Sequence, residues 1–397
     1  MAEEQHSHQS ASLLGPGPVI GMVAGEASGD MLGAHLIEAL RKQLPNAQFV
    51  GIGGSKMVAV GMQTLFPMEK LAVRGYIEVL RHFREILGIR NKLIRYFREN
   101  PPDVFIGVDA PDFNLALEKA LKKRGTPTIH YVSPSIWAWR GERIHKIAKS
   151  ASHVMAIFPF EKPLYDAIKL PCTYVGHPLA DFLPDSPNRF AMREQLHLSQ
   201  DAVVFAMLPG SRQSELQYMA ELYIRTAQEI AAAKPHVHFL VPLVSRETRS
   251  YFEEILYRLG AQDLPLTILF GHAHDAMIAA DVVLVASGTA TLEAALLGRP
   301  MVITYKMPPA SYRIMKRKGY LPYVGLPNIL AGKFVVPEIL QDDATPENLA
   351  QALLNEVSDP VVGVRLANEF ARIRRELKQD TAEKAVEALL PYLKAGR

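Results

Sequence analysis

Short apolar runs alternate with longer amphipathic stretches along most of the chain. The amphipathic stretches have apolar positions three and four residues apart, which predicts helices. Unbroken apolar strands separated by helices are typical of a parallel sheet that helices cover on both faces. The apolar runs predict strands at Val19–Ala24, Phe49–Ile52, Asp103–Val108, Thr128–Val132, Val154–Phe158, Val203–Leu208, Phe239–Val244, Leu266–Phe270, Val282–Ala286 and Met301–Tyr305.

The order of these elements predicts an α/β protein with two doubly wound domains that face a central cleft. The alternation stops at residues 183–188, whose sequence LPDSPN is rich in Pro, Asp and Ser, and then restarts. We therefore expect an N-terminal Rossmann-like domain over residues 18–185 and a C-terminal one over residues 186–360. The charged helical segment 361–397 is expected to pack back on the first domain. Residues 1–17 contain no apolar secretory signal and are expected to form a loose tail.

Composition narrows the class of protein. The 397 residues are 48% hydrophobic and 21% charged, which is typical of a globular protein and not of a disordered or fibrous one. The net charge of +3 gives no reason to expect a nucleic-acid partner. A single cysteine, Cys172, excludes an intrachain disulfide framework and indicates a reducing compartment. The apolar stretch Met277–Gly298 contains charged residues and is interpreted as a strand and a helix, so we expect a soluble or peripheral protein.

The first predicted strand ends in a turn with the sequence AGEASGD, at residues 24–30. Because the turn lacks GxGxxG, neither a dinucleotide site nor an oxidoreductase is expected. Gly25 and Gly29 allow a close approach to a ligand, and Ser28 or Asp30 can cap the following helix. The turn either contacts sugar hydroxyls or is an ordinary capped connection.

Asp109 directly follows the apolar strand that begins at Asp103. The carboxyl ends of parallel strands border the ligand crevice in doubly wound sheets. A partly desolvated carboxylate in that position is suited to act as a general base. A structural role for Asp109 is the alternative, and Asp112 is interpreted as the cap of the next helix.

Both tryptophans follow the next strand, in the segment SPSIWAWR at residues 133–140. Aromatic rings beside hydroxyl groups at the end of a strand are suited to stack on a sugar. Trp137 and Trp139 therefore either contact a ligand or pack between the domains.

Two strand–helix turns in the second domain have the features of a nucleotide site. Gly210 and Ser211 offer backbone N–H groups at a helix start, and Arg212 adds a cation, which together suit a diphosphate. The later turn SGTATLE contains Thr289 in a nest of small residues, and Glu293 is placed to accept hydrogen bonds from a ribose. The alternatives are a surface turn for Arg212 and a capping box for Glu293.

Metal chemistry has little support in the sequence. His272 and His274 follow a strand, but two histidines without further ligands are weak evidence for a metal site. The chain contains neither a Walker motif nor a Gly-x-Ser-x-Gly elbow. We therefore expect no metal.

A basic amphipathic helix is predicted between the second and third strands. Its apolar face is wider than one packing stripe requires and is bordered by arginines. Such a face suits an anionic bilayer surface, and the alternative is an ordinary helix packed on the first sheet. The apolar residues of this face are Ile77, Val79, Leu80, Phe83, Ile86 and Leu87.

A set of short motifs accumulates in order along the chain: GEASGD, VGIGG, DVFIGVDAPDFN, IHYVSPSIWAWR, FPFEK, VGHPLAD, LPGSR, ASGTATLE and LPNILAG. Together they closely resemble the lipid-A-disaccharide synthase family, from about Val19 to the C-terminal helices. The resemblance implies the GT-B architecture, with 2,3-diacylglucosamine 1-phosphate on the N-terminal domain and UDP-2,3-diacylglucosamine on the C-terminal domain. The implied products are UDP and a β-1,6-linked disaccharide 1-phosphate.

The resemblance also implies roles for individual residues. Asp109 matches the family's base, Arg212 its diphosphate-binding arginine, Glu293 its ribose-binding acid and Asn328 a polar residue near the site. The helix from Ile77 to Leu87 matches the membrane-docking region, which favours the functional interpretation of its apolar face. The implied protein is cytoplasmic and peripheral on the inner face of the inner membrane of a Gram-negative bacterium. No cofactor is implied, and an oligomeric assembly is compatible with the sequence.

The implied reaction is an inverting transfer in which Asp109 takes a proton from the acceptor 6-hydroxyl. Arg212 and helix-start amides stabilise the departing diphosphate in place of a divalent metal. A UDP-sugar 2-epimerase, another lipid-linked sugar transferase and a non-catalytic UDP-sugar-binding protein are the alternatives. The apolar, arginine-bordered helix favours a lipidic acceptor over an epimerase, and Asp109 at a strand end argues against a mere binding protein.

Overall fold

The computed structural model describes residues 17–71 and 76–394, with the side chains at 76–83, 310, 314, 318 and 394 left out. The chain forms two compact units. The first unit comprises the chain up to Asp181 and from Leu377 onward, and the second comprises Phe182–Glu376. The sequence analysis placed these limits at 185 and 360, so the structure assigns nearly all of the helix Pro360–Leu377 to the second unit. The expected tail lies outside the described residues, except for Gly17.

A parallel sheet of seven strands forms the centre of the first unit, in the order β3-β2-β1-β4-β5-β6-β7. The apolar runs of the sequence form β1, β2, β4, β5 and β6, which confirms those predictions. The sequence analysis missed β3 and β7, because edge strands this short carry no periodic signal. The strands are β1 Val19–Ala24, β2 Gln48–Ile52, β3 Gln63–Thr64, β4 Val104–Val108, β5 Thr128–Tyr131, β6 His153–Ala156 and β7 Cys172–Tyr174.

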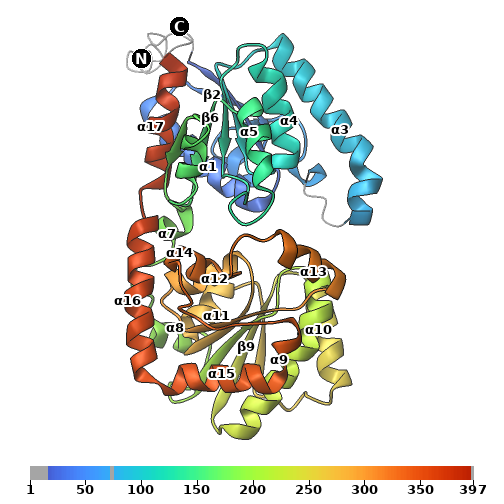
Figure 1. Ribbon diagram of the computed structural model, residues 1–397, viewed down its shortest axis with the longest axis vertical. Helices are drawn as coiled ribbons and strands as arrows, with labels where there is room; N and C mark the ends of the chain where they lie inside the picture. The colour runs from blue at the N-terminus through green and yellow to red at the C-terminus, as the bar shows by residue number, and fades with distance from the viewer. Residues whose placement is uncertain (1–16, 72–75, 395–397) are drawn as a thin grey trace, which may run out of the picture. The chain divides into compact units, whose positions relative to one another are not determined.

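Helices cover this sheet and bury its apolar side chains. Helices α3, α4 and α5 lie side by side, and α1 lies against α17 (Figure 1). Helix α3 buries Ile89, Leu93 and Phe97 in the same cluster as Phe105 of β4, as its apolar spacing requires. The helices are α1 Ala27–Gln43, α2 Ser55–Ala59, α3 Tyr76–Glu99, α4 Pro111–Lys122, α5 Ile144–Ser150, α6 Lys162–Asp166, α7 Pro178–Phe182 and α17 Thr381–Lys394, with short 3₁₀ turns at Met68–Lys70 and Gly141–Arg143.

The second unit repeats this plan with a parallel sheet of six strands, in the order β10-β9-β8-β11-β12-β13. All five strands predicted in this part of the sequence are present, and only the edge strand β13 was missed. The stretch Met277–Gly298 divides into part of a helix, the buried strand β11 and a following helix, so its interpretation is confirmed in essence. The strands are β8 Val203–Leu208, β9 Val237–Leu243, β10 Leu266–Phe270, β11 Val282–Ala286, β12 Met301–Tyr305 and β13 Glu338–Leu340.

Two layers of helices enclose the second sheet. Helices α10, α9 and α15 form one row of neighbours, while α8, α11, α12 and α14 form another (Figure 1). The helices are α8 Arg189–Gln195, α9 Gln213–Ala233, α10 Arg246–Arg258, α11 Ala273–Ala279, α12 Thr289–Leu296, α13 Pro309–Lys318, α14 Leu326–Ala331, α15 Pro346–Ser358 and α16 Pro360–Leu377, with a 3₁₀ turn at Gln341–Asp343. Among the helices that the structure describes, none is long and apolar enough to cross a membrane.

The segment predicted to connect the domains is tied to α16. The Arg374 guanidinium donates hydrogen bonds to the carbonyl oxygens of Leu183 and Pro184, each at 3.0 Å, and to the Asp185 carboxylate at 2.9 Å. A guanidinium has five N–H donors in a fixed plane, so one side chain can hold several consecutive residues. The Pro-rich segment is therefore fixed within the second unit.

The strand order reverses once in each sheet, and these reversals locate the candidate sites. In the first sheet the chain moves outward in opposite directions from the pair β1 and β4, and in the second from the pair β8 and β11. The crossover helices that follow the two central strands lie on opposite faces, which leaves a crevice at their carboxyl ends. The turns after β1, β4, β8 and β11 are four of the five segments that the sequence analysis selected as candidate ligand sites. The fifth is the tryptophan segment, which follows β5.

Candidate functional site

Asp109 is the first residue after β4, at the strand-order reversal of the first sheet. Its backbone has a φ of 52° and that of Ala110 a φ of 44°, a left-handed region that residues with a side chain mostly avoid. The amide of Asp109 donates to the Tyr131 carbonyl at 2.8 Å, so the turn is tied to the neighbouring strand β5. Strained residues that the surrounding structure holds in place are typical of functional sites.

Two neighbours fix this strained turn. The Asn114 side chain, buried in α4, donates to the carbonyl oxygens of Asp109 at 2.8 Å and of Val23 at 3.2 Å. Gly25 lies so close to the turn that a Cβ there would come within 2.8 Å of the Ala110 Cβ. The turns after β1 and β4 therefore lie against each other, and Gly25 is needed for this approach. The sequence analysis expected Gly25 to allow the approach of a ligand, whereas the close neighbour in the structure is Ala110.

The surroundings of Asp109 adjust its acidity. Burial raises the pKa of the Asp109 carboxyl above its ordinary value, and the negative charge of Glu26 raises it further. The charge of His130 and the Ala110 amide act in the opposite direction. Burial alone would lower the pKa of His130, but Glu118, whose Oε1 lies 2.7 Å from Nδ1, and Asp109 raise it. Asp109 is therefore a partly desolvated carboxyl beside a buried charged pair, which suits proton transfer.

The residues of the first turn have structural roles that differ from those expected. Helix α1 has no side-chain cap, so the expected capping by Ser28 or Asp30 is wrong. Ser28 is exposed, whereas Asp30 is buried and caps the start of the separate helix α2. Its carboxylate accepts hydrogen bonds from the amides of Gly54 at 2.8 Å, Lys56 at 3.0 Å and Met57 at 3.1 Å. Of Ser28 and Asp30, only Ser28 therefore remains a candidate to contact a ligand.

Trp137 is held in an aromatic cluster by a buried carboxyl. Its indole N–H donates to Glu161 Oε1 at 3.1 Å, and its ring packs edge-on against Phe158 and Phe160. Glu161 Oε2 accepts from the amides of Ile157 at 3.1 Å and Phe158 at 3.0 Å. Burial raises the pKa of Glu161 to about 7, although these hydrogen bonds oppose the shift. The sequence analysis missed Glu161, because nothing in the FPFEK motif indicates a partner so far along the chain.

The Arg212 turn is organised by a carboxylate that the sequence analysis did not identify. Glu215 Oε2 accepts hydrogen bonds from the amides of Ser211 at 2.9 Å and Arg212 at 3.1 Å. Gly210 has a φ of 119°, and a Cβ there would lie 2.6 Å from the same oxygen. The sequence analysis expected the Ser211 amide to bind a ligand. In the structure this amide donates to Glu215 instead. The position of Glu215, three residues after Arg212, is the capping-box signal that could have revealed it.

The Arg212 guanidinium itself extends from this turn. Its side chain is 59% exposed and lies 4.0 Å from Glu215 Oε1, too far for a strong ion pair. It follows β8 at the strand-order reversal of the second sheet, and Thr289 follows β11 across the same reversal. The two turns selected for a diphosphate are therefore neighbours in the fold, and Arg212 is available to bind an anion.

Glu293 is paired with a histidine and not with a helix cap. Its Oε2 lies 3.0 Å from His274 Nε2, across the contact between α12 and α11. The hydrogen bond to Glu293 is the main cause that raises the pKa of His274. The capping-box alternative for Glu293 is wrong, because the helix-start residue Gly288 has no side-chain cap and Thr291, not Glu293, is the third residue of the helix. His274 thus orients a carboxylate and is not part of a metal cluster in the described residues.

Asn328 belongs to the scaffold of the second unit. Its side chain is fully buried, and its Nδ2 donates to the Val336 carbonyl at 3.0 Å and to Glu338 Oε1 at 2.8 Å. Its Oδ1 accepts from the amides of Val335 at 2.8 Å and Val336 at 3.0 Å. Because these bonds use the full capacity of the amide group, the expected placement of Asn328 beside a ligand is not what the structure shows.

The amphipathic face of α3 is only partly described. Ile86 packs against the core cluster of the first unit, and Leu87 is half-buried. These two residues are therefore compatible both with a helix packed on the first sheet and with a face that contacts a membrane surface. The remaining apolar residues of the face lie outside the described side chains: Ile77, Val79, Leu80 and Phe83.

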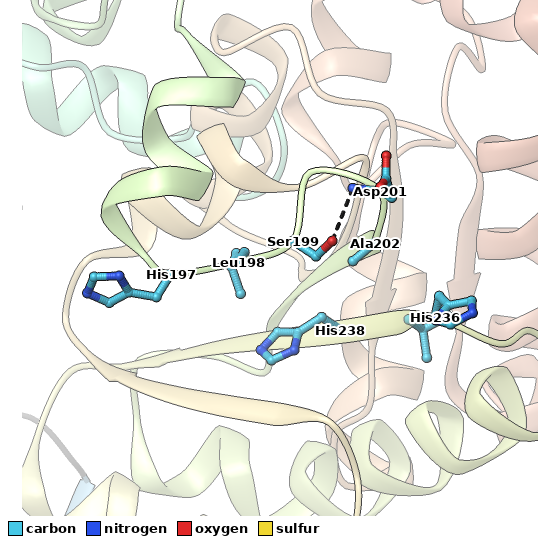
Figure 2. Close-up of a pocket in the computed structure, with 8 residues that line it drawn as sticks. His197, Leu198, Ser199, Asp201, Ala202, His236 and His238 are labelled. Carbon is cyan, nitrogen blue, oxygen red and sulfur yellow. Dashed lines mark hydrogen bonds between the residues drawn. The ribbon is translucent and has the colours of Figure 1, made fainter.

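A hollow of about 260 Å³ lies elsewhere, at the amino ends of β8 and β9. It is lined by His197, Ser199, Asp201, His236 and His238 together with apolar neighbours. Figure 2 shows the three imidazoles spread along the hollow and not converging on one point. The described residues contain no cluster of His, Cys, Asp or Glu able to hold a metal. Since ligands bind at the opposite, carboxyl ends of parallel strands, this hollow is not the candidate site.

Comparisons with known proteins find relatives over nearly the whole chain. Residues 20–390 match the family model described as lipid-A-disaccharide synthetase. The lipid-A-disaccharide synthase of Methylobacillus flagellatus is 58% identical over 377 residues, which cover 95% of this chain and 100% of that protein. The synthase of Aromatoleum aromaticum is 57% identical over 374 residues, which cover 94% and 96%.

Solved structures share the fold at low sequence identity. The UDP-GlcNAc 2-epimerase of Neisseria meningitidis, bound to UDP-GlcNAc, aligns with a TM-score of 0.65 and 13% identity, covering 94% of this chain and 99% of that one. MurG of Acinetobacter baumannii aligns with a TM-score of 0.55 and 17% identity, covering 95% and 100%. At these identities the likeness concerns the fold, and it confirms a GT-B protein with two Rossmann-like units.

The hydrogen bonds of Asn328 generate a first prediction. Asn328→Ala should lower the free energy of unfolding of the second unit by roughly 2–4 kcal/mol, because it leaves buried amides and a carbonyl without partners. Hydrogen exchange of second-unit amides at increasing urea concentration measures the change. Asn355→Ala, at an exposed amide of α15, is the control and should change it by less than about 1 kcal/mol. Equal stability of the two variants would contradict the scaffold role.

Proposed function

Because the chain belongs to the lipid-A-disaccharide synthetase family, it is a glycosyltransferase of lipid A biosynthesis, and we propose that Asp109 and Arg212 carry its chemistry. The reaction joins UDP-2,3-diacylglucosamine to 2,3-diacylglucosamine 1-phosphate and releases UDP. The single observation that carries the residue assignment is their placement. Each lies in the turn between a central strand and the following helix, at the strand-order reversal of its own sheet.

The first unit takes the acceptor and the second takes the UDP-sugar donor. The first unit offers a carboxyl with a raised pKa at its reversal and lacks a cation in the described turn beside it. The second unit offers an exposed guanidinium and a helix start at the corresponding place. A diphosphate is bound by cations and amides, so the donor suits the second unit. A hydroxyl is activated by a base, so the acceptor suits the first unit.

Asp109 removes the proton of the acceptor 6-hydroxyl as that oxygen attacks C1 of the donor sugar. The bond from O6 to C1 forms while the bond from C1 to the phosphate oxygen breaks, and its electron pair leaves with UDP. Attack on the face opposite UDP inverts the configuration at C1 and gives the β-1,6 linkage without a covalent enzyme intermediate. A hydroxyl is too weak an acid to ionise first, so a base with a raised pKa is suited to this step.

Arg212 stabilises the negative charge that grows on the departing diphosphate. Its position is maintained by Glu215, which holds the turn by the amides of Ser211 and Arg212. Gly210, the Ser211 hydroxyl and Thr289 line the diphosphate on either side of the guanidinium. A cation placed where negative charge grows lowers the barrier, because it stabilises the departing group.

Glu293 and the first-unit residues Ser28 and Trp137 complete the proposed contacts. Glu293 accepts hydrogen bonds from the two ribose hydroxyls, and His274 holds its carboxylate in place at 3.0 Å. Ser28 is an exposed hydroxyl beside the Gly25 turn, and Trp137 offers an aromatic ring on the carboxyl side of β5. Both are suited to bind a sugar.

The chain works at an anionic membrane surface, on the inner face of the inner membrane. Both substrates carry acyl chains that remain in a bilayer, because their exposure to water is unfavourable. The basic amphipathic helix α3 supports this placement, since arginines accompany its apolar residues along the sequence. Its apolar residues Ile77, Val79, Leu80, Phe83, Ile86 and Leu87 are the proposed docking face.

Replacing the base tests the mechanism. Asp109→Asn should lower kcat by roughly 10²–10⁴-fold, because an amide does not accept the proton, while the affinity for UDP stays the same. Release of UDP with both acylated substrates measures kcat, and calorimetry measures UDP binding. Asp112→Asn is the matched control, because Asp112 lies three residues away and its side chain is 80% exposed. Full activity of the Asp109→Asn variant would remove Asp109 from this role.

The raised pKa of Asp109 predicts the pH dependence. The base acts only when ionised, so kcat/KM should fall on acidification at a pH above the ordinary range of aspartate. Glu26→Gln removes a negative charge that raises this pKa, so the acid limb should move to lower pH. Glu254→Gln, at an exposed position of α10, is the control for a change of charge elsewhere. An acid limb that does not move in Glu26→Gln would contradict this electrostatic account.

Replacing the cation tests the diphosphate contact. Arg212→Ala should weaken UDP binding by roughly 10- to 150-fold, the loss expected for hydrogen bonds to a charged group. Calorimetric titration with UDP measures the dissociation constant. Arg246→Ala removes an exposed arginine from the start of another helix of the same unit and should leave it unchanged. If the Arg212→Ala variant binds UDP as tightly as the parent protein, Arg212 does not contact the diphosphate.

A further inference from the structure

One segment of the second unit concentrates positive charge. No Asp or Glu occurs between Glu293 and Glu338, although the whole chain has 41 acidic residues against 44 Lys and Arg. The interval includes the whole of α13 and the residues that follow it. Its basic residues are Arg299, Lys306, Arg313, Lys316, Arg317, Lys318 and Lys333. The near-neutral overall composition therefore conceals a strongly basic local surface.

The centre of this segment also exposes large apolar side chains. Met315 is 40% exposed, Tyr320 58% and Leu321 40%. The cations Lys316 and Arg317, which are exposed as well, lie between Met315 and Tyr320 in the sequence. Single exposed apolar residues are common, but their combination with cations on one helix and its continuation is typical of helices that lie in a membrane interface.

The position of the segment relates it to the donor site. Helix α13 follows β12, so it starts from the carboxyl edge of the second sheet. The turns of Arg212 and Thr289 leave the same edge, because all strands of this sheet are parallel. Figure 1 shows α12, α13 and α14 at the same end of the second unit. The basic surface and the proposed diphosphate site therefore belong to one end of this unit.

We propose that the segment Arg313–Leu321, here called the α13 surface, docks on an anionic lipid bilayer when the second unit takes up its donor. The inference rests on the proposed function, in which the donor is a nucleotide-sugar with two acyl chains. Such a donor keeps its chains in the bilayer while its diphosphate enters the protein, so the unit that binds it must contact the membrane. Cations attract the anionic headgroups, and Met315 and Leu321 enter the interface.

A nucleic acid is the other macromolecule that a basic surface can bind. Phosphate contacts would use the cations but give no role to exposed Met315 and Leu321. The acylated substrates of the family give the bilayer a direct connection with the reaction. The apolar residues therefore favour the bilayer, and nucleic-acid binding becomes an outcome of the test.

Vesicle flotation of the full-length protein tests the proposal. Lys316→Glu/Arg317→Glu should reduce partitioning into phosphatidylcholine vesicles with about a quarter phosphatidylglycerol by roughly 10- to 30-fold. Met315→Ser/Leu321→Ser should also weaken binding, and these exposed positions should leave the melting temperature unchanged. The matched control is Lys146→Glu/Lys149→Glu, which makes the same change of charge on exposed positions of α5 in the first unit.

The outcomes separate the proposal from its alternatives. Parental partitioning of both α13 variants would overturn it, as would an equal loss in the α5 control, which would indicate a general effect of charge. Loss of oligonucleotide binding with unchanged vesicle binding would assign the surface to nucleic acid and also overturn it.

Kinetics distinguish this inference from the proposed catalytic residues. With short-chain substrates dispersed in detergent, the α13 variants should keep the parental kcat and UDP affinity, and with vesicle-embedded substrates their apparent KM should rise. If the catalytic assignment were wrong, the Asp109→Asn enzyme would be active, and this result would not depend on vesicle binding. An unchanged KM on vesicles in the α13 variants would contradict a role of the surface in donor uptake.

Discussion

The parallel direction of the strands is the constraint on which both candidate sites depend. In each sheet every strand ends at the same edge, and the chain leaves the central pair in opposite directions. The helices after those two strands cover opposite faces of the sheet, so only the turns between them stay open to a ligand. Asp109 and Arg212 each occupy such a turn.

Several carboxylates serve as anchors for backbone amides and not as reactants. Asp30 holds the start of α2, Glu161 the turn after β6, Glu215 the Arg212 turn and Glu338 the amides before α14. A carboxylate accepts several hydrogen bonds at once, which lets one side chain fix an entire loop. Asp109 differs, because burial raises its pKa and its turn is held by other groups. This division leaves one carboxyl at the first reversal suited to chemistry.

The proposed membrane association would concern each unit separately. A transferase for acylated sugars must reach both substrates without withdrawing their chains from the bilayer. The basic helix α3 in the first unit and the α13 surface, Arg313–Leu321, in the second each combine cations with apolar residues in the sequence. Under the proposed function, each unit would bind one lipid substrate and would approach the membrane by its own surface.

The sequence by itself determined the longer strands, the two units in outline and the family, because apolar periodicity and turn residues are local signals. Asp109 and Arg212 were candidates from the sequence because each lies in the turn after an apolar strand. Only the tertiary structure decided that Asp30 caps a different helix and that Asn328 is buried in the scaffold. Hydrogen-bond partners that lie on other elements leave no periodic trace in the sequence, so a polar residue reveals its chemistry locally but its partner only in the folded chain.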